Sequence, residues 1–188
     1  MKTTLAAVRR LLLISIAAVL AACASLESPR VITFTEADIA RLLEQHGAFQ
    51  RRLLEVLDVR VQRPTVRLLT GSNRLSTVFD VAATERISRT TLSGRLDVDY
   101  GLRYDEQAQA IRMTQVRVNS LQLDNVPAEK RSGVRNLGAM IAEHLLDDAV
   151  LYRFKPSDLK SAEGKGYKPG TVTVTSRGVE VTLAPVGR

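Results

Sequence analysis

Apolar and polar residues alternate with a period of two over long stretches of the chain. The clearest run extends from Leu92 to Tyr104, where apolar residues or glycine alternate with Ser, Arg, Asp and Gly. Successive side chains of a strand point to opposite faces of its sheet, so the pattern predicts strands with one buried and one hydrated face. Similar runs cover residues 53–68 and 75–83. The longest run exceeds the ~5–6 residues of a typical strand, which favours a curved sheet.

A fourth alternating run, residues 111–123, changes phase twice along its length. One extra residue in a strand turns all the following side chains to the other face, so these changes predict β-bulges. We expect one bulge near Gln115 and a second near Asn119 or Ser120. With a polar turn at residues 104–109, the four runs predict a strongly curved antiparallel meander.

Two segments have the periodicity of helices. Thr35, followed three residues later by Asp38, is a variant of the capping box and predicts a helix over residues 36–46. A longer apolar stripe over residues 127–155 predicts a second helix nearly as long as the longest strand. A hairpin with its turn at residues 176–178 is expected to close the chain.

Gly133 and Gly138 fall inside the long predicted helix. Each glycine costs about 1 kcal/mol relative to alanine at such a position. Two explanations stay open, because the sheet either approaches the helix closely there or the helix is locally weak.

The N-terminal segment has the features of a secretory signal that ends at the single cysteine. Basic residues precede an apolar stretch from Leu11 to Leu20, which is too short to span a bilayer as a helix. The segment Leu20–Cys23 resembles the lipobox of bacterial lipoproteins, where the cysteine thiol receives a diacylglyceryl group and the chain is cut before it. The alternatives are a plain signal peptide with a chance cysteine and an uncleaved anchor. Ala24, in place of Asp, favours the outer membrane by analogy with lipoprotein sorting.

The lipobox divides the chain into three parts. We expect a signal peptide at residues 1–22, a lipidated cysteine with a short tether at residues 23–34, and one lipid-binding-like α+β domain at residues 35–188. At ~3.4 Å per residue, the fully extended tether reaches about 40 Å. The domain is therefore expected to stay close to its membrane, on the periplasmic side of the bacterial envelope.

Composition limits the partners of such an exported domain. The formal net charge of the whole chain is +7, and loss of three basic residues with the signal peptide lowers it to +4. No cysteine besides Cys23 is available for a disulfide, so packing must stabilise the domain. Trp is absent and other aromatic residues are few, which argues against a base-stacking surface. We expect no nucleic-acid partner.

The sequence contains no catalytic motif of the G-x-S-x-G, P-loop or H-E-x-x-H type. His144 and Asp148 lie one helical turn apart, but a zinc site needs a third ligand, and a contact between the two on the helix surface is the simpler interpretation. Glu143 and Asp147 are interpreted as a solvated helix edge rather than a catalytic carboxylate pair. We therefore expect no enzyme activity, no metal and no cofactor.

Arginine is frequent at the hydrated positions of the predicted strands. Such a face suits anionic lipid head groups or lipopolysaccharide. Asp97 and Asp99 are interleaved with the arginines, however, which favours an ordinary soluble sheet face. The arginines concerned are Arg60, Arg67, Arg95 and Arg103.

As a whole, the chain resembles the YceB-like family of small bacterial lipoproteins, which is defined by a domain of unknown function. The resemblance rests on the lipobox at Cys23, the early helix, the strand meander, the long helix through Leu145 and the hairpin at Gly170–Leu183. It implies a fold similar to tubular lipid-binding proteins, in which a curled antiparallel sheet wraps one long helix and leaves an apolar groove. The resemblance assigns no functional residue besides Cys23.

The expected fold class is α+β, with a curved four-stranded antiparallel meander wrapped around the long C-terminal helix, an N-terminal helix and a closing C-terminal hairpin. An apolar sheet face and a helix apolar around much of its girth can enclose a slot that suits an acyl chain. A core filled by side chains is the alternative. The residues expected to line the slot are Leu92, Leu96, Val98, Tyr100 and Leu102 from the sheet and Leu137, Ile141 and Leu145 from the helix.

Two functions follow from these expectations. The first is a membrane-anchored envelope lipoprotein that binds or transfers a lipid or another apolar ligand between sheet and helix. The second is a non-enzymatic structural or assembly partner of envelope proteins, which uses the arginine-rich face or the exposed edge strands.

Overall fold

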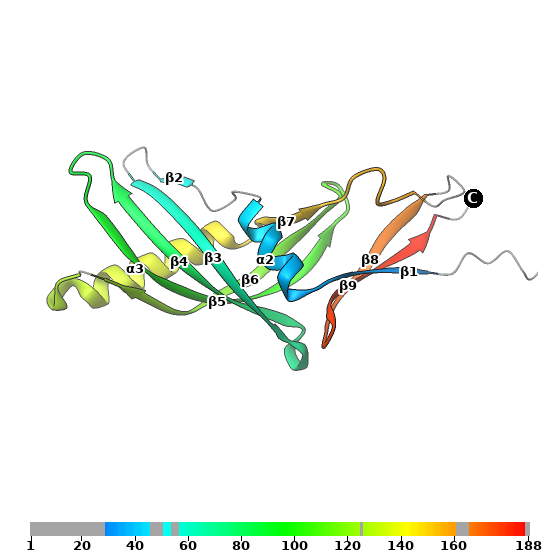
Figure 1. Cartoon of the computed structure of the whole chain (residues 1–188), viewed down its shortest axis with the longest axis horizontal. Helices are drawn as coiled ribbons and strands as arrows, with labels where there is room; N and C mark the ends of the chain where they lie inside the picture. Colours follow the sequence, from blue (N-terminus) through cyan, green and yellow to red (C-terminus); the bar gives the residue numbers. More distant parts are fainter. Residues whose placement is uncertain (1–28, 46–50, 54–56, 125, 161–165, 187–188) are drawn as a thin grey trace, which may run out of the picture.

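The structure is a computed structural model that describes residues 29–45, 51–53, 57–124, 126–160 and 166–186. The described chain is mostly β, and its two antiparallel sheets follow one another along an elongated molecule (Figure 1). The larger sheet has the strand order β2-β3-β4-β5-β6-β7, and the smaller sheet has the order β1-β9-β8.

The larger sheet is a curled meander in which each strand pairs with the strands next to it in the sequence, and a helix is inserted between the last two strands. Its strands are β2 (Arg51–Leu53), β3 (Leu57–Leu69), β4 (Arg74–Glu85), β5 (Thr91–Asp105), β6 (Ala110–Leu123) and β7 (Val150–Arg153), with a short 3-10 turn, η2 (Thr70–Ser72), between β3 and β4.

The alternation predicted for the central strands is confirmed. On β5, Leu96, Val98 and Tyr100 are buried, whereas Arg95 and Arg103 are exposed. We call the buried side the inner face of the larger sheet, and the opposite side its outer face.

Both predicted bulges in β6 are confirmed by the pairing with β5. The register shifts once between the pairs Asp97–Ser120 and Val98–Val118, which leaves Asn119 as the extra residue. It shifts again near Gln115, whose φ of 51° lies in the left-handed region. A third bulge was not expected. It lies on β3 between Gln62 and Thr65, next to Pro64, which has no amide hydrogen for the ladder.

The first helix, α2 (Glu36–Gln45), begins at the predicted capping box. The Thr35 backbone N–H donates to the Asp38 carboxylate at 3.1 Å, and the Asp38 N–H donates to the Thr35 hydroxyl oxygen at 3.2 Å. The Thr35 hydroxyl also donates to Asp38, and this bond is the main reason that the pKa of Asp38 is lowered. The cap fixes where α2 begins, and Ile39 and Leu43 then point into the core.

The expected fold class is wrong in its main features. The larger sheet has six strands rather than four, and a second, three-stranded sheet accompanies it. The second helix, α3 (Ala128–Leu146), is shorter than the predicted segment 127–155, and among its described residues only Leu146 is buried. The helix thus lies along one side of the curled sheet and is not enclosed by it (Figure 1).

The predicted helix was too long because residues 150–153 form the edge strand β7. There Tyr152 lies opposite Ile111 of β6. A short apolar run fits a buried strand as well as a helix, so Val150 and Leu151 extended the helical stripe in the sequence pattern. Asp148, with a φ of 65°, turns the chain out of the helix before the strand begins.

The smaller sheet brings together segments from the two ends of the described chain. Its strands are β1 (Arg30–Phe34), β8 (Tyr167–Thr175) and β9 (Gly178–Pro185), of which the last two form the predicted closing hairpin. Residues 30–34 were placed in the tether, but they form β1, in which Arg30 pairs with Leu183 and Phe34 with Val179. The predicted signal peptide and the predicted lipobox with Cys23 lie outside the described residues.

Two hydrophobic clusters connect these parts. The first fills the middle of the inner face, where α2, α3, β7 and the β8–β9 hairpin meet the larger sheet. The second joins the smaller sheet to the ends of β5 to β7 around three ring contacts that link Phe34, Tyr104, Tyr152 and Phe154.

Candidate functional site

A groove of about 290 Å³ lies between α3 and one end of the inner face. Its described lining residues are all apolar or glycine, and they come from β3, β4, β5, β6 and α3. They are Val59, Val61, Val81, Ala82, Ala83, Leu92, Leu96, Leu121, Leu123, Val134, Leu137, Gly138, Ile141, Ala142, Leu145 and Leu146. A concave, apolar space of this size is a candidate site for an apolar ligand.

Helix α3 forms one wall of the groove because it packs mainly against one strand, β6. At Gly138 an added Cβ would lie 2.6 Å from Cδ2 of Leu121, so glycine allows the helix to approach the sheet there. Leu137, on the open flank of the helix, is 54% exposed although it lines the groove. The space between α3 and the strands β3 to β5 thus opens to water along the helix.

Of the two explanations for the glycines in α3, the close approach of the sheet holds at one position only. Close approach of the sheet accounts for Gly138. No heavy atom within 4 Å would meet a Cβ at Gly133, so packing does not require glycine there.

Carboxylates near the end of α3 fix this wall of the groove. Glu143 Oε1 accepts a hydrogen bond from the Val118 backbone N–H at 2.8 Å, and Asp147 Oδ1 accepts one from Val116 at 3.4 Å. Both N–H groups lie beside the bulges of β6, where ladder partners are interrupted. The interpretation of Glu143 and Asp147 as a solvated helix edge missed these contacts with the sheet, although Asp147 is exposed.

Asp148, the residue after Asp147, also connects the end of α3 to the larger sheet. Asp148 accepts hydrogen bonds from Arg103 and Arg112, and Arg112 also bonds to Asp105 at 2.7 Å. The contact expected between Asp148 and His144 is thus replaced by contacts with arginines of the sheet, and His144 is exposed. No cluster of three or more metal-ligating side chains occurs among the described residues.

The structure brings together most of the residues that were expected to line the slot. Leu92, Leu96, Leu137, Ile141 and Leu145 line the groove. Val98 and Tyr100 do not, because they are completely buried in the filled part of the inner face, and Leu102 packs against the same core.

Sequence reasoning missed the contributions of β3, β4 and β6. Val59, Val61, Val81 and Ala83 lie at alternate positions of two neighbouring strands, and Leu123 belongs to the third. Their alternation was visible in the sequence and predicted a buried face. It did not show which end of that face is left uncovered by side chains.

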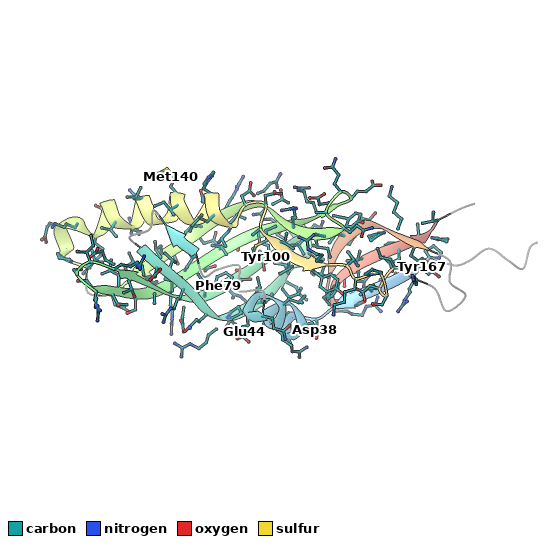
Figure 2. All side chains as sticks on the ribbon, turned by 90° about the horizontal axis from the view of Figure 1, so that it is seen from above. Asp38, Glu44, Phe79, Tyr100, Met140 and Tyr167 are labelled. Atoms are coloured by element: carbon teal, nitrogen blue, oxygen red, sulfur yellow. The ribbon has the colours of Figure 1, made fainter. Side chains whose placement is uncertain are left out.

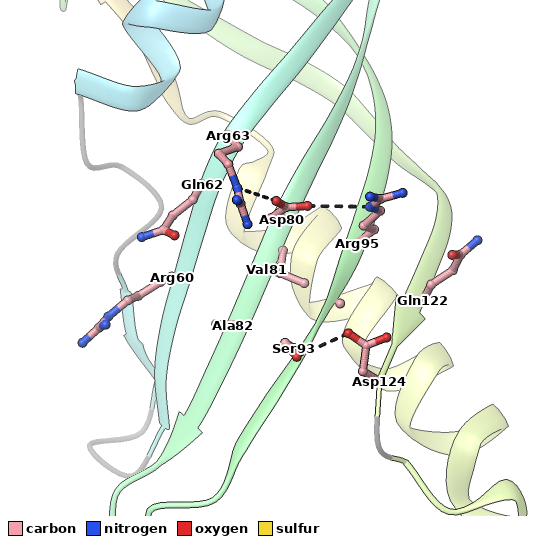
Figure 3. Close-up of a pocket in the computed structure, with 11 residues that line it drawn as sticks. Arg60, Gln62, Arg63, Asp80, Val81, Ala82, Ser93, Arg95, Gln122 and Asp124 are labelled. Carbon is pink, nitrogen blue, oxygen red and sulfur yellow. Dashed lines mark hydrogen bonds and ion pairs between the residues drawn. The ribbon is translucent and has the colours of Figure 1, made fainter.

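A second pocket, of about 520 Å³, lies on the outer face, behind the groove (Figure 3). Asp80 is its central acid, with Arg63 at 2.6 Å and Arg95 at 3.7 Å. On its other side, the Ser93 hydroxyl donates to Asp124 at 3.3 Å. Arg60 also borders the pocket. The acids that accompany the arginines of this pocket are Asp80 and Asp124, whereas Asp97 and Asp99, on which the sequence prediction rested, are not among its lining residues.

None of the described helices combines the length and the hydrophobicity that a membrane-spanning helix requires.

Comparisons with known proteins add little to this description. No protein-family model matches the sequence, and no curated protein matches it, so the resemblance to the YceB-like family gains no support. Among solved structures, a crystal structure of lipopolysaccharide binding protein aligns with a TM-score of 0.34 and 9% sequence identity. The alignment covers 84% of this chain and 40% of that chain. Similarity at this level assigns neither a fold family nor a ligand to the chain.

Proposed function

We propose that the protein binds an acyl chain of a lipid, or an apolar molecule of similar width, in the groove between α3 and the inner face. The observation that carries this proposal is the lining itself, in which every described side chain is apolar. If a methylene group needs the ~30 Å³ that a water molecule occupies, the groove of about 290 Å³ holds about ten methylene groups.

The expected affinity is moderate. Each buried methylene contributes about 0.8 kcal/mol, so ten would contribute about 8 kcal/mol before the cost of association is subtracted. No polar side chain among the described lining residues is available to orient a head group. The groove is therefore expected to bind acyl chains with low selectivity and to release them readily, as a lipid carrier does.

We also propose that the protein works as a lipoprotein of the bacterial envelope, held by acyl chains on Cys23, without enzyme activity. The sequence features of residues 1–23 support this part of the proposal. Mass spectrometry of the N-terminal peptide from a membrane fraction tests it. We expect a chain that begins at an acylated Cys23, and an unmodified Cys23 inside a longer peptide would contradict the anchor.

Binding in the groove is tested by filling it. Ala142 lines the groove from α3, and Ala142→Phe places a ring in the space that a chain would occupy. Met140 is 61% exposed on the side of α3 that points away from the sheet (Figure 2), so Met140→Phe is the matched control on the same helix. We expect the affinity for a fatty acid, measured by displacement of a fluorescent analogue, to fall at least tenfold in Ala142→Phe. The affinity should stay unchanged in Met140→Phe.

Native mass spectrometry of the protein, purified gently from membranes, gives a second readout. We expect a copurifying lipid in the unsubstituted chain and in Met140→Phe, but not in Ala142→Phe. The proposal fails if the unsubstituted chain carries no lipid and binds no fatty acid, or if both variants bind equally well.

A further inference from the structure

The hairpin between β4 and β5 presents an isoleucine to water at the end of the molecule that contains the groove. Ile87 is 85% exposed, which is more than any other large apolar residue of the described chain. Figure 1 shows this hairpin and the first turns of α3 at one end of the molecule, with β1 and the C-terminal strands at the other. Ala83 and Leu92, which face each other just below the hairpin, line the groove.

Hydrogen bonds hold the hairpin in the conformation that exposes Ile87. Glu85 accepts from the backbone N–H groups of Ile87 at 2.9 Å and Ser88 at 2.7 Å. The Ser88 side chain is the main reason that the pKa of the Glu85 carboxyl group is lowered, and the two backbone bonds lower it further. The Glu85 N–H donates to the carbonyl of Thr90 at 2.8 Å. A buried partner within the chain is therefore not what determines the position of Ile87.

The residues around Ile87 are basic. Arg86 and Arg89 flank it, and Arg89 adopts a φ of 56°, a region in which arginine is uncommon. The first turns of α3, at the same end of the molecule, contain Lys130, Arg131 and Arg135, all exposed. Glu85 and Glu129 are the acids of these two segments, and Asp58 of β3 lies 3.9 Å from Arg86, so basic residues still outnumber acidic ones there.

We propose that the β4–β5 hairpin is a membrane-contact tip, in which Ile87 enters the interface of an anionic bilayer while the surrounding basic side chains bind its head groups. An exposed aliphatic side chain flanked by cations fits such a surface, because each Lys or Arg near an anionic membrane contributes about 1 kcal/mol. This inference rests on the proposed function, since it gives the groove a place from which an acyl chain enters. The partner proposed for the tip is a lipid bilayer and not another protein.

The chain contains no tryptophan, so Ile87→Trp creates a single fluorescent reporter in the tip of the full-length protein. Ser72→Trp, in the exposed turn at the other end of β4, is the matched control. Any anchor near the N-terminus is common to both variants, so a difference between them reports which end of the sheet meets the bilayer. Vesicles of phosphatidylcholine, with and without phosphatidylglycerol, serve as the probe.

We expect the emission of Ile87→Trp to shift to shorter wavelength with phosphatidylglycerol vesicles, and brominated lipids to quench it. Arg89→Gln in the same background should raise the lipid concentration at half-maximal shift about fivefold. The proposal is overturned if Ile87→Trp does not respond, if Ser72→Trp responds equally, or if phosphatidylcholine alone gives the same shift.

Adding Ala142→Phe to Ile87→Trp separates this proposal from the proposed function. The filled groove should leave the vesicle response unchanged, because Ala142 does not belong to the tip. If Ile87→Trp with an unfilled groove responds to vesicles but binds no fatty acid, the groove is refuted as an acyl site and the membrane contact stands.

Discussion

The inner face of the larger sheet has a filled half and an open half, although the same strands build both. In the filled half, Leu75, Phe79, Val98 and Tyr100 are at most 1% exposed and pack below α2 and the β8–β9 hairpin. In the open half, most of the side chains that border the groove beneath α3 are only half-buried, although Leu96 and Leu121 are buried. Alternation of apolar residues therefore specifies a face, whereas the elements that cover it decide between core and binding site.

The inward side chains of a single strand also become smaller from the filled half to the open half. The inward positions of β4 are Leu75, Thr77 and Phe79 in the filled half, followed by Val81 and Ala83 in the open half. Small side chains under a helix that packs mainly on β6 leave space that a close-packed interior does not leave. The groove thus depends on small residues of β4 as much as on the position of α3.

The comparison is tested most strongly by the same substitution in each half. Leu75 is fully buried, and Leu75→Ala should lower the free energy of unfolding by about 3–5 kcal/mol, because it removes packed methyl groups and leaves a cavity. Leu92 borders the groove, and Leu92→Ala should cost only about 1 kcal/mol, the lower end for a side chain already in partial contact with water. Urea denaturation measures both values. Equal costs would mean that the open half is filled.

A second test asks whether water reaches the buried polar groups of the filled half. The hydroxyl groups of Tyr100 and Thr77 form a buried hydrogen bond of 2.9 Å. Tyr100→Phe leaves Thr77 without that partner and should cost about 1–3 kcal/mol. Denaturation of both proteins at neutral pH measures this difference, and an unchanged stability would indicate that water reaches Thr77.

Alkaline titration sharpens the same test. Burial raises the pKa of Tyr100 well above its ordinary value of 10.0, so the unfolded chain loses the phenolic proton first as the pH rises. The stability that the neutral phenol provides is complete below pH 10 and declines above it. We expect Tyr100→Phe to reduce this alkaline decline. An identical decline in both proteins would assign it to other groups.

Local signals in the sequence predicted much of this architecture. The phase changes around Gln115 and Asn119 predicted the bulges of β6, because a bulge alters the alternation at the residue where it occurs. The capping box at Thr35 and Asp38 predicted the start of α2 for the same reason, since its partners are three residues apart.

Features that depend on distant segments were not predictable in this way. The pairing of β1 with β9 joins residues far apart in the sequence. Val31, Ile32 and Phe34 are residue types that favour strands, but so short a run does not show with which strand it pairs. Val98 and Leu92 follow the same alternation, yet one is core and the other borders the groove, because other elements cover the sheet at Val98. The groove was therefore predictable as a face of the sheet, but its extent was not.

The smallest predicted effects come from the two glycines of α3, and they test how the helix holds the groove open. Gly133→Ala meets no heavy atom within 4 Å and should raise stability by about 1 kcal/mol through helix propensity alone. Gly138→Ala places a methyl group 2.6 Å from Leu121, so Leu121 or the helix must move, which offsets that gain. Thermal denaturation compares the two. Because displacement of α3 from β6 alters the groove, Gly138→Ala should also change fatty-acid binding, whereas Gly133→Ala should not. If both variants gain stability equally and bind alike, the close contact at Gly138 does not set the width of the groove.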